Sequence, residues 1–177
     1  MRVRETKLKN MNKVETIKFL QDDHKALEKV LENLFPEDFV TFRVLGTWKI
    51  KDVISHLSSW NIELKKSIDK LLNNEELWFF KESEDYFNKI QVMKRKSYTV
   101  KRVLEEWEET FADLIFKIDD LTDEEWEFVS NFNWKSGTSV TVKSLFSYRK
   151  RGKGHEGYHA LLIEEYFERD YCDCERY

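Results

Sequence analysis

The stretch KIKDVISHLSSWNIELKKSIDKLLN, residues 49–73, decides which fold this chain can adopt. Its large apolar side chains recur mostly at steps of three and four residues, which places them on one face of an α-helix. They are Ile50, Val53, Ile54, Leu57, Trp60, Leu64, Ile68 and Leu71. A helix with so broad an apolar stripe is stable only when other elements cover the stripe. The segment therefore predicts a long helix inside a bundle.

Three further segments carry the same spacing. One covers residues 17–34 and ends before Pro36, and another covers residues 99–119. The last runs from residue 145 to 166 and includes the run RKRGKG (149–154). Each glycine in a helix costs about 1 kcal/mol relative to alanine, but the apolar register is the same on both sides of the run. We therefore expect this helix to continue through it, and four such helices predict an all-α four-helix bundle.

The composition agrees with a single helical domain. Of the 177 residues, 41% are hydrophobic and 15% aromatic, but only five are glycine and one is proline. A fold of many strands needs more of these turn residues. We expect an N-terminal tail at residues 1–11, one bundle domain at residues 12–170 and a C-terminal tail at residues 171–177.

The connections between the helices carry weaker signals. Thr122 and Glu125 match a capping box, which predicts the start of a short helix. The aromatic-rich residues 78–87 either cover the interior of the bundle or fill a dimer interface. The predicted connections are residues 35–46 and 129–139, which we expect to be loops, and residues 75–96, which we expect to be ordered with a short helix.

Charge and hydropathy argue against several classes of partner. The net charge of −4 and the pI near 5.7 differ from the basic surface of a nucleic-acid-binding domain. No apolar run approaches the ~20 residues of a membrane span. The two cysteines, Cys172 and Cys174, are too close together to staple a fold and too few for a four-cysteine zinc site. We therefore expect a cytoplasmic protein with no nucleic-acid partner and no membrane partner.

All four histidines lie on or beside the apolar stripes. His155 and His159 are four residues apart, which puts them on one helix face with Cβ atoms about 6 Å apart. Two buried imidazoles need polar partners, and a divalent metal ion satisfies both. His56, at the edge of the stripe in residues 49–73, is the best candidate for a third ligand. Three histidines with open coordination positions are typical of a catalytic metal site.

The motif HEGYH (155–159) also matches the His-Glu-x-x-His pattern of zinc peptidases. Those enzymes take their third ligand downstream of the motif, where this chain has no further histidine. A protease is therefore disfavoured. Glu156 is a weak candidate for a general base acting through a bound water, and the alternative is a carboxylate outside the set of metal ligands.

Four other residues near the predicted site have open roles. His24 is either an ordinary core residue, a fourth ligand or a proton shuttle. Trp60 and Tyr158 either line a pocket or pack in the core. Glu63 either orients a ligand or faces solvent.

The segments WKIKDVISHLSSWN (48–61) and HEGYHALLIEEYF (155–167) resemble the DinB/YfiT-like superfamily. The first is similar to the start of that family's second helix, and the second to the His-x-x-x-His of its last helix. The resemblance implies a four-helix bundle, often a homodimer, with nickel or zinc held by His56, His155 and His159. It also implies metal-dependent transfer of a low-molecular-weight thiol to a small electrophile, or hydrolysis or isomerisation.

The segments TWKIKDVISHLSSWN (47–61) and FNWKSGTSVTVKSL (132–145) also resemble the ClbS/DfsB-like branch. That resemblance implies a metal-free protein that protects its host against a toxic metabolite. Three hypotheses therefore stay open. The first is a divalent-metal-dependent transferase or hydrolase acting on a small electrophilic molecule in stress or detoxification. The second is such a self-protection protein, and the third is a non-catalytic bundle with structural histidines.

Overall fold

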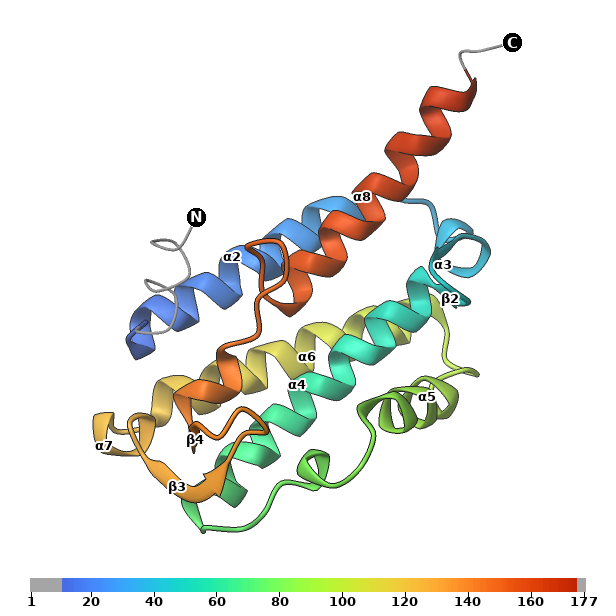
Figure 1. Cartoon of the computed structure of the whole chain (residues 1–177). Helices are drawn as coiled ribbons and strands as arrows, with labels where there is room; N and C mark the ends of the chain where they lie inside the picture. Colours follow the sequence, from blue (N-terminus) through green and yellow to red (C-terminus); the bar gives the residue numbers. More distant parts are fainter. Residues whose placement is uncertain (1–10, 175–177) are drawn as a thin grey trace.

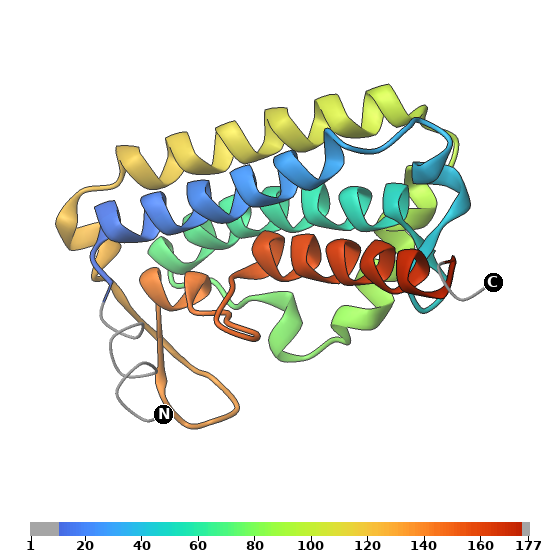
Figure 2. The same ribbon diagram turned by 90° about the horizontal axis from the view of Figure 1, so that it is seen from above.

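Four long helices form the body of the computed structural model, which describes residues 11–174 and the side chains up to residue 168 (Figure 1). They run side by side when seen from above (Figure 2). The most extensive packing joins α4 to α6 and α2 to α8. The predicted all-α four-helix bundle is thus confirmed. The four helices are α2 (Lys13–Leu31), α4 (Ile50–Leu72), α6 (Val100–Asp120) and α8 (His155–Cys174).

Reciprocal capping boxes begin α2 and the short helix α7. At the start of α2, the Asn12 side chain accepts the Glu15 N–H at 2.8 Å, and Glu15 accepts the Asn12 N–H at 3.0 Å. Thr122 and Glu125 make the same reciprocal pair at the start of α7 (Asp123–Trp126), which confirms that prediction. Because both partners lie within four residues, local sequence is enough to place such helix starts.

The apolar core has two parts, separated by buried polar groups. The N-terminal half of α4 packs with α2, α6 and α8, and its Ile54 and Leu57 are almost fully buried. The C-terminal half packs against α6 and the segments after it, with Ile68 and Leu71 fully buried. The polar side chains that α4 buries are Ser55, His56, Ser58, Ser59, Asn61, Glu63 and Ser67. The functional site therefore has to be sought in this polar band.

The prediction that the last helix runs through residues 149–154 is wrong. The chain forms a short 3₁₀ helix, η2 (Lys143–Phe146), and then a tight turn in which Lys150 and Lys153 exchange backbone hydrogen bonds of 2.9 and 3.1 Å. Arg151 and Gly152 have positive φ, as a type I′ turn requires of its two central residues. The apolar register on either side of the turn was a coincidence of spacing.

The three predicted connections contain short elements. Residues 35–46 hold α3 (Asp38–Thr41) and β1 (Arg43–Leu45), which pairs with β2 (Trp48–Lys49). Residues 129–139 are not a plain loop, because β3 (Val129–Asn133) and β4 (Ser139–Thr141) pair there as a hairpin. The ordered connection predicted at residues 75–96 is confirmed, and it contains η1 (Trp78–Phe80) and α5 (Glu84–Lys94).

The bounds of the described structure can be compared with the two predicted tails. Most of the predicted N-terminal tail, residues 1–10, and residues 175–177 lie outside the described part. Helix α8 continues to Cys174, past the predicted start of the C-terminal tail at residue 171. Within the described residues, none of the helices combines the length and the apolar character that crossing a membrane requires.

Candidate metal site

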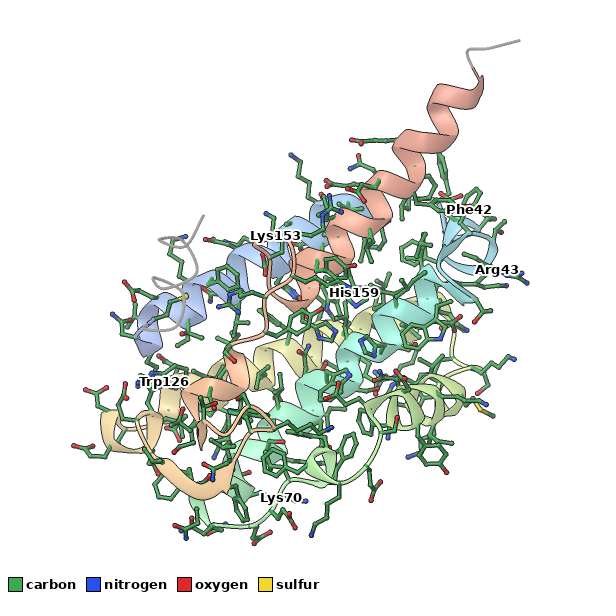
Figure 3. All side chains as sticks on the ribbon, in the orientation of Figure 1. Phe42, Arg43, Lys70, Trp126, Lys153 and His159 are labelled. Carbon is green, nitrogen blue, oxygen red and sulfur yellow. The ribbon has the colours of Figure 1, made fainter. Side chains whose placement is uncertain are left out.

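Helices α4 and α8 bring three histidines together in the polar band. One ring nitrogen each from His56, His155 and His159 lies within 4.8 Å of the others. The Nε2 atoms of His56 and His155 are 2.8 Å apart. His159 lies between α8 and α4 in the interior of the bundle (Figure 3), with its ring centroid 5.4 Å from that of His56. Imidazole nitrogens sit about 2 Å from a bound zinc ion, so the three surround a space that fits one ion.

Burial keeps these three imidazoles neutral. It lowers the pKa of His56 to about 4, against a smaller opposing effect of the Asn88 side chain. Burial, together with the neighbouring His56, lowers the pKa of His159 to about 3. The pKa of His155 is also lowered well below its ordinary value, first by burial and then by the other two histidines. Neutral imidazole is the form that binds a metal ion.

The three-histidine cluster is short of hydrogen-bond partners. The buried Nδ1 of His56 has none among the described residues. The contact between the Nε2 atoms of His56 and His155 allows only one of them to donate. A divalent ion accepts lone pairs from all three rings, and nitrogen ligands of this kind suit zinc, nickel or copper. The residues present therefore fit a bound metal ion.

Asp23 of α2 determines where α8 begins. Its Oδ2 atom accepts the N–H of Gly154 at 2.6 Å, immediately before the first residue of the helix. A Cβ atom at Gly157 would lie 2.2 Å from Asp23 Oδ1. Gly157 is therefore needed because the first turn of α8 packs directly on this carboxylate. Burial raises the pKa of Asp23, which has only 5% of its surface exposed.

Glu156, the acidic residue of the HEGYH motif, binds three other helices. Its Oε2 atom accepts a hydrogen bond of 2.7 Å from His24 Nδ1 of α2. Its Oε1 atom accepts bonds from Trp107 Nε1 of α6 at 2.9 Å and from Asn61 Nδ2 of α4 at 3.3 Å. Both oxygens of this buried carboxylate are thus engaged in tying α8 to the bundle, which gives the weakly predicted base role no support.

His24 belongs to this second cluster and not to the first. Its Nε2 atom lies 3.2 Å from Glu108 Oε2, and its ring stacks on Phe111 at a centroid distance of 3.7 Å. Burial lowers the pKa of His24, but Glu156 and Glu108 outweigh burial and raise the pKa above its ordinary value. We call His24, Glu156 and Glu108 the His24–Glu156 network. The predicted roles of His24 as a fourth ligand or shuttle have no contact to support them.

Trp60, Tyr158 and Glu63 take different positions around the three histidines. The Trp60 ring is 6.4 Å from the rings of both His56 and His155, and the Tyr158 ring is 5.9 Å from that of His159. Glu63 is buried and accepts the indole N–H of Trp78 at 2.6 Å. It therefore holds η1 against α4 and does not face solvent, and its role in orienting a ligand stays a prediction.

The aromatic-rich residues 78–87 pack over α4 beside the site. Besides Glu63, they contact Trp60 of α4, whose ring lies 5.3 Å from that of Phe87. The Trp60 indole N–H also donates to Asn88 Oδ1 at 2.8 Å. The two predicted roles of this stretch were a cover over the bundle interior and part of a dimer interface. Its contacts within one chain are those of a cover.

The sequence did not single out two residues that contact the histidines. Trp48 lies 5.1 Å from His56, and Tyr148 lies 5.5 Å from His155, both measured between ring centroids. Tyr148 follows η2 and is 47% exposed, and His155 is less buried than His56 and His159. The site is therefore approached past Tyr148. An aromatic residue ahead of the HEGYH motif was the available signal, but the assumed continuous helix had assigned it to the core.

Comparisons of sequence find no protein-family model and no curated protein that match the chain. Comparisons of structure do find similar folds. A mycothiol-dependent maleylpyruvate isomerase matches with a TM-score of 0.70 at 14% identity over 88% of this chain. The chain spans 62% of that isomerase. An uncharacterised protein from Escherichia coli UTI89 matches with a TM-score of 0.70 at 14% identity, over 92% of this chain and 96% of the other.

The colibactin self-resistance protein ClbS, solved in complex with dsDNA, also matches. Its TM-score is 0.66 at 14% identity, over 86% of this chain and 93% of ClbS. These structures have the DinB/YfiT-like fold, and the chain shares that fold, as its sequence motifs indicated. The expected exclusion of nucleic-acid partners is not consistent with the ClbS complex, so net charge alone was an insufficient ground for it.

Proposed function

We propose that His56, His155 and His159 bind one divalent metal ion, Ni²⁺ or Zn²⁺, and that the protein is a metal-dependent transferase or hydrolase. The observation that carries the proposal is the meeting of three neutral imidazoles from two helices, two of them buried and His155 half-buried, with one ring nitrogen from each within 4.8 Å of the others. Three protein ligands leave positions for water and substrate. A bound ion supplies Lewis acidity and lowers the pKa of a coordinated water or thiol.

The substrate we propose is a small electrophilic molecule, and the co-substrate a low-molecular-weight thiol. The structural similarity to a mycothiol-dependent isomerase supports a thiol. The chain's own residues then have separate tasks. The three histidines hold the ion, Trp60 and Tyr148 flank the approach to His155, and the His24–Glu156 network fixes the helix that carries two of the ligands.

We also propose that the protein is a cytoplasmic homodimer that acts in stress or detoxification. Support for the dimer comes from the family resemblance, and support for the cytoplasm from the absence of a cysteine pair suited to a stabilising disulfide. Light scattering of the purified protein at several concentrations measures the oligomeric state, and a monomer at every concentration would contradict the dimer.

Metal analysis of the purified protein tests the central proposal. We expect close to one Ni or Zn ion per chain, lost in the His56→Ala and His159→Ala variants. His24→Gln is the matched control, because it replaces a buried histidine outside the cluster and should retain the metal. Wild-type protein that contains no metal, gains none from added Ni²⁺ or Zn²⁺ and is unchanged in stability by a chelator would contradict the proposal and favour the metal-free ClbS-like alternative.

A further inference from the structure

The turn before α8 carries four cationic side chains, and the structure separates them by their partners. Arg149 stacks on the Phe19 ring at 3.9 Å and donates to backbone carbonyls. Arg151 makes two hydrogen bonds of 2.9 and 2.6 Å to Glu165. Among the described residues, Lys150 has no carboxylate at ion-pair distance, and its Nζ atom lies 4.5 Å from the centroid of the Tyr158 ring. Among the described residues, Arg151 is thus the one cation of the turn that pairs with a carboxylate, and the ammonium group of Lys150 contacts an aromatic ring instead.

Lys150 lies at the approach to the three-histidine cluster. Tyr158, which its ammonium group contacts, is itself 5.9 Å from His159 between ring centroids. Tyr148, two residues before Lys150, is 5.5 Å from His155. These ring contacts place Lys150 and Tyr148 on the side of the cluster formed by His155 and His159.

The turn is built to hold this cation in place. The paired backbones of Lys150 and Lys153 fix its conformation. Arg149 on Phe19 and Arg151 on Glu165 anchor it on both sides, and Asp23 binds the Gly154 N–H where the turn meets α8. A lysine on a restrained backbone, without an acidic partner, is suited to pair with an anion from solution.

We propose that Lys150, together with the Tyr148 hydroxyl, binds an oxyanion group on the small molecule that enters the three-histidine site. The substrate or the co-substrate thiol therefore belongs to the class of small molecules with a carboxylate or similar anionic group. This inference rests on the proposed metal site and adds a selectivity for charge.

Simple thiols that differ in charge test the inference with Co²⁺ as the bound metal. Thiolate binding to Co²⁺ changes its absorption spectrum, and titration then yields an affinity without any turnover. The probes are 3-mercaptopropionate, which is anionic, 2-mercaptoethanol, which is neutral, and cysteamine, which is cationic. We expect the wild-type protein to bind 3-mercaptopropionate about tenfold more tightly than 2-mercaptoethanol at low salt, and cysteamine more weakly than both.

The variant Lys150→Gln should lose the preference for the anionic thiol and keep its affinity for 2-mercaptoethanol. Lys153→Gln is the matched control, because it removes the same charge from the same turn and should keep the preference. 2-Mercaptoethanesulfonate shows whether Lys150 selects carboxylates or any oxyanion; a preference for either one supports the inference.

Two results would overturn it. One is a Lys150→Gln variant that keeps the wild-type ratio of affinities, and the other is an equal loss of the preference in Lys153→Gln. Both leave the proposed metal site intact, because Co²⁺ is still bound. A protein that takes up no Co²⁺, Ni²⁺ or Zn²⁺ contradicts the proposed function, and the inference fails with it.

Discussion

Two neighbouring residues of α8 belong to two buried polar clusters of opposite character. His155 joins His56 and His159, where three neutral imidazoles share too few partners. Glu156 joins His24, where the carboxylate receives hydrogen bonds from three helices. A satisfied network stabilises the fold, whereas a cluster of unsatisfied lone pairs stabilises it only with a ligand bound. The Glu156 cluster therefore holds the helix, and the three-histidine cluster is the one for which we propose a metal ion.

The largest expected effect comes from removing the carboxylate of the satisfied network. Glu156→Ala leaves His24, Trp107 and Asn61 without their buried partner, and we expect a loss of about 3–5 kcal/mol in the free energy of unfolding. Urea denaturation followed by circular dichroism measures it. The control Glu164→Ala changes an exposed residue of the same helix and should stay within about 0.5 kcal/mol of wild type. A loss for Glu156→Ala as small as that of the control would show that the network does not hold α8.

The two clusters should make opposite contributions to stability as pH changes. The pKa values of His56 and His159 are lowered to about 4 and about 3, so in the metal-free protein their contribution is lost as pH falls below about 6.5. The pKa of His24 is raised, so its contribution is present below about 6.5 and lost as pH rises through the folded-state value. We expect an acid-side loss of roughly 3 kcal/mol for each of His56 and His159 by pH 4.

Denaturation of chelated protein between pH 4 and pH 9 measures both slopes. His56→Phe should reduce the acid-side slope and leave the alkaline side unchanged, and Glu156→Gln should do the reverse. The assignment of charge to the two clusters is wrong if one variant removes both slopes.

A smaller effect is expected where α8 packs on Asp23. Gly157→Ala places a Cβ atom 2.2 Å from the position of Asp23 Oδ1, and the resulting displacement should cost about 1–3 kcal/mol. In an ordinary helix position the same change stabilises, so the sign is diagnostic. A double-mutant cycle with Asp23→Ala should show strong non-additivity. Additive effects would indicate that the glycine does not pack on this carboxylate.

The smallest expected effect concerns the outer carboxylate of the His24–Glu156 network. Glu108 lies 3.2 Å from His24, and its side chain is 52% exposed. Because solvent screens such a pair, Glu108→Gln should cost no more than about 1 kcal/mol. Titration of His24 by NMR in both glutamate variants ranks the partners, and Glu156→Gln should lower the pKa of His24 more than Glu108→Gln does.

Prediction from sequence succeeded where partners are close along the chain. The stripe in residues 49–73, the capping box at Thr122 and the pairing of His155 with His159 depend on spacings of three or four residues. It failed for residues 149–154, because the apolar spacing is compatible with a helix and the turn is stabilised by Phe19 and Asp23 from α2. It also did not show which way the Glu156 side chain points, because a position in a helix does not by itself determine which other helices the side chain contacts.

The sequence by itself determined the bundle and the residue types from which a metal site is built. Only the tertiary structure decided where α8 begins, because the acceptor for Gly154 lies 131 residues away on Asp23. The same long-range packing explains why residue 157 is a glycine. It also directs Glu156 away from the neighbouring histidines and leaves Lys150 against an aromatic ring rather than a carboxylate. Periodicity along a helix is a local property, whereas the satisfaction of buried polar groups depends on which helices meet.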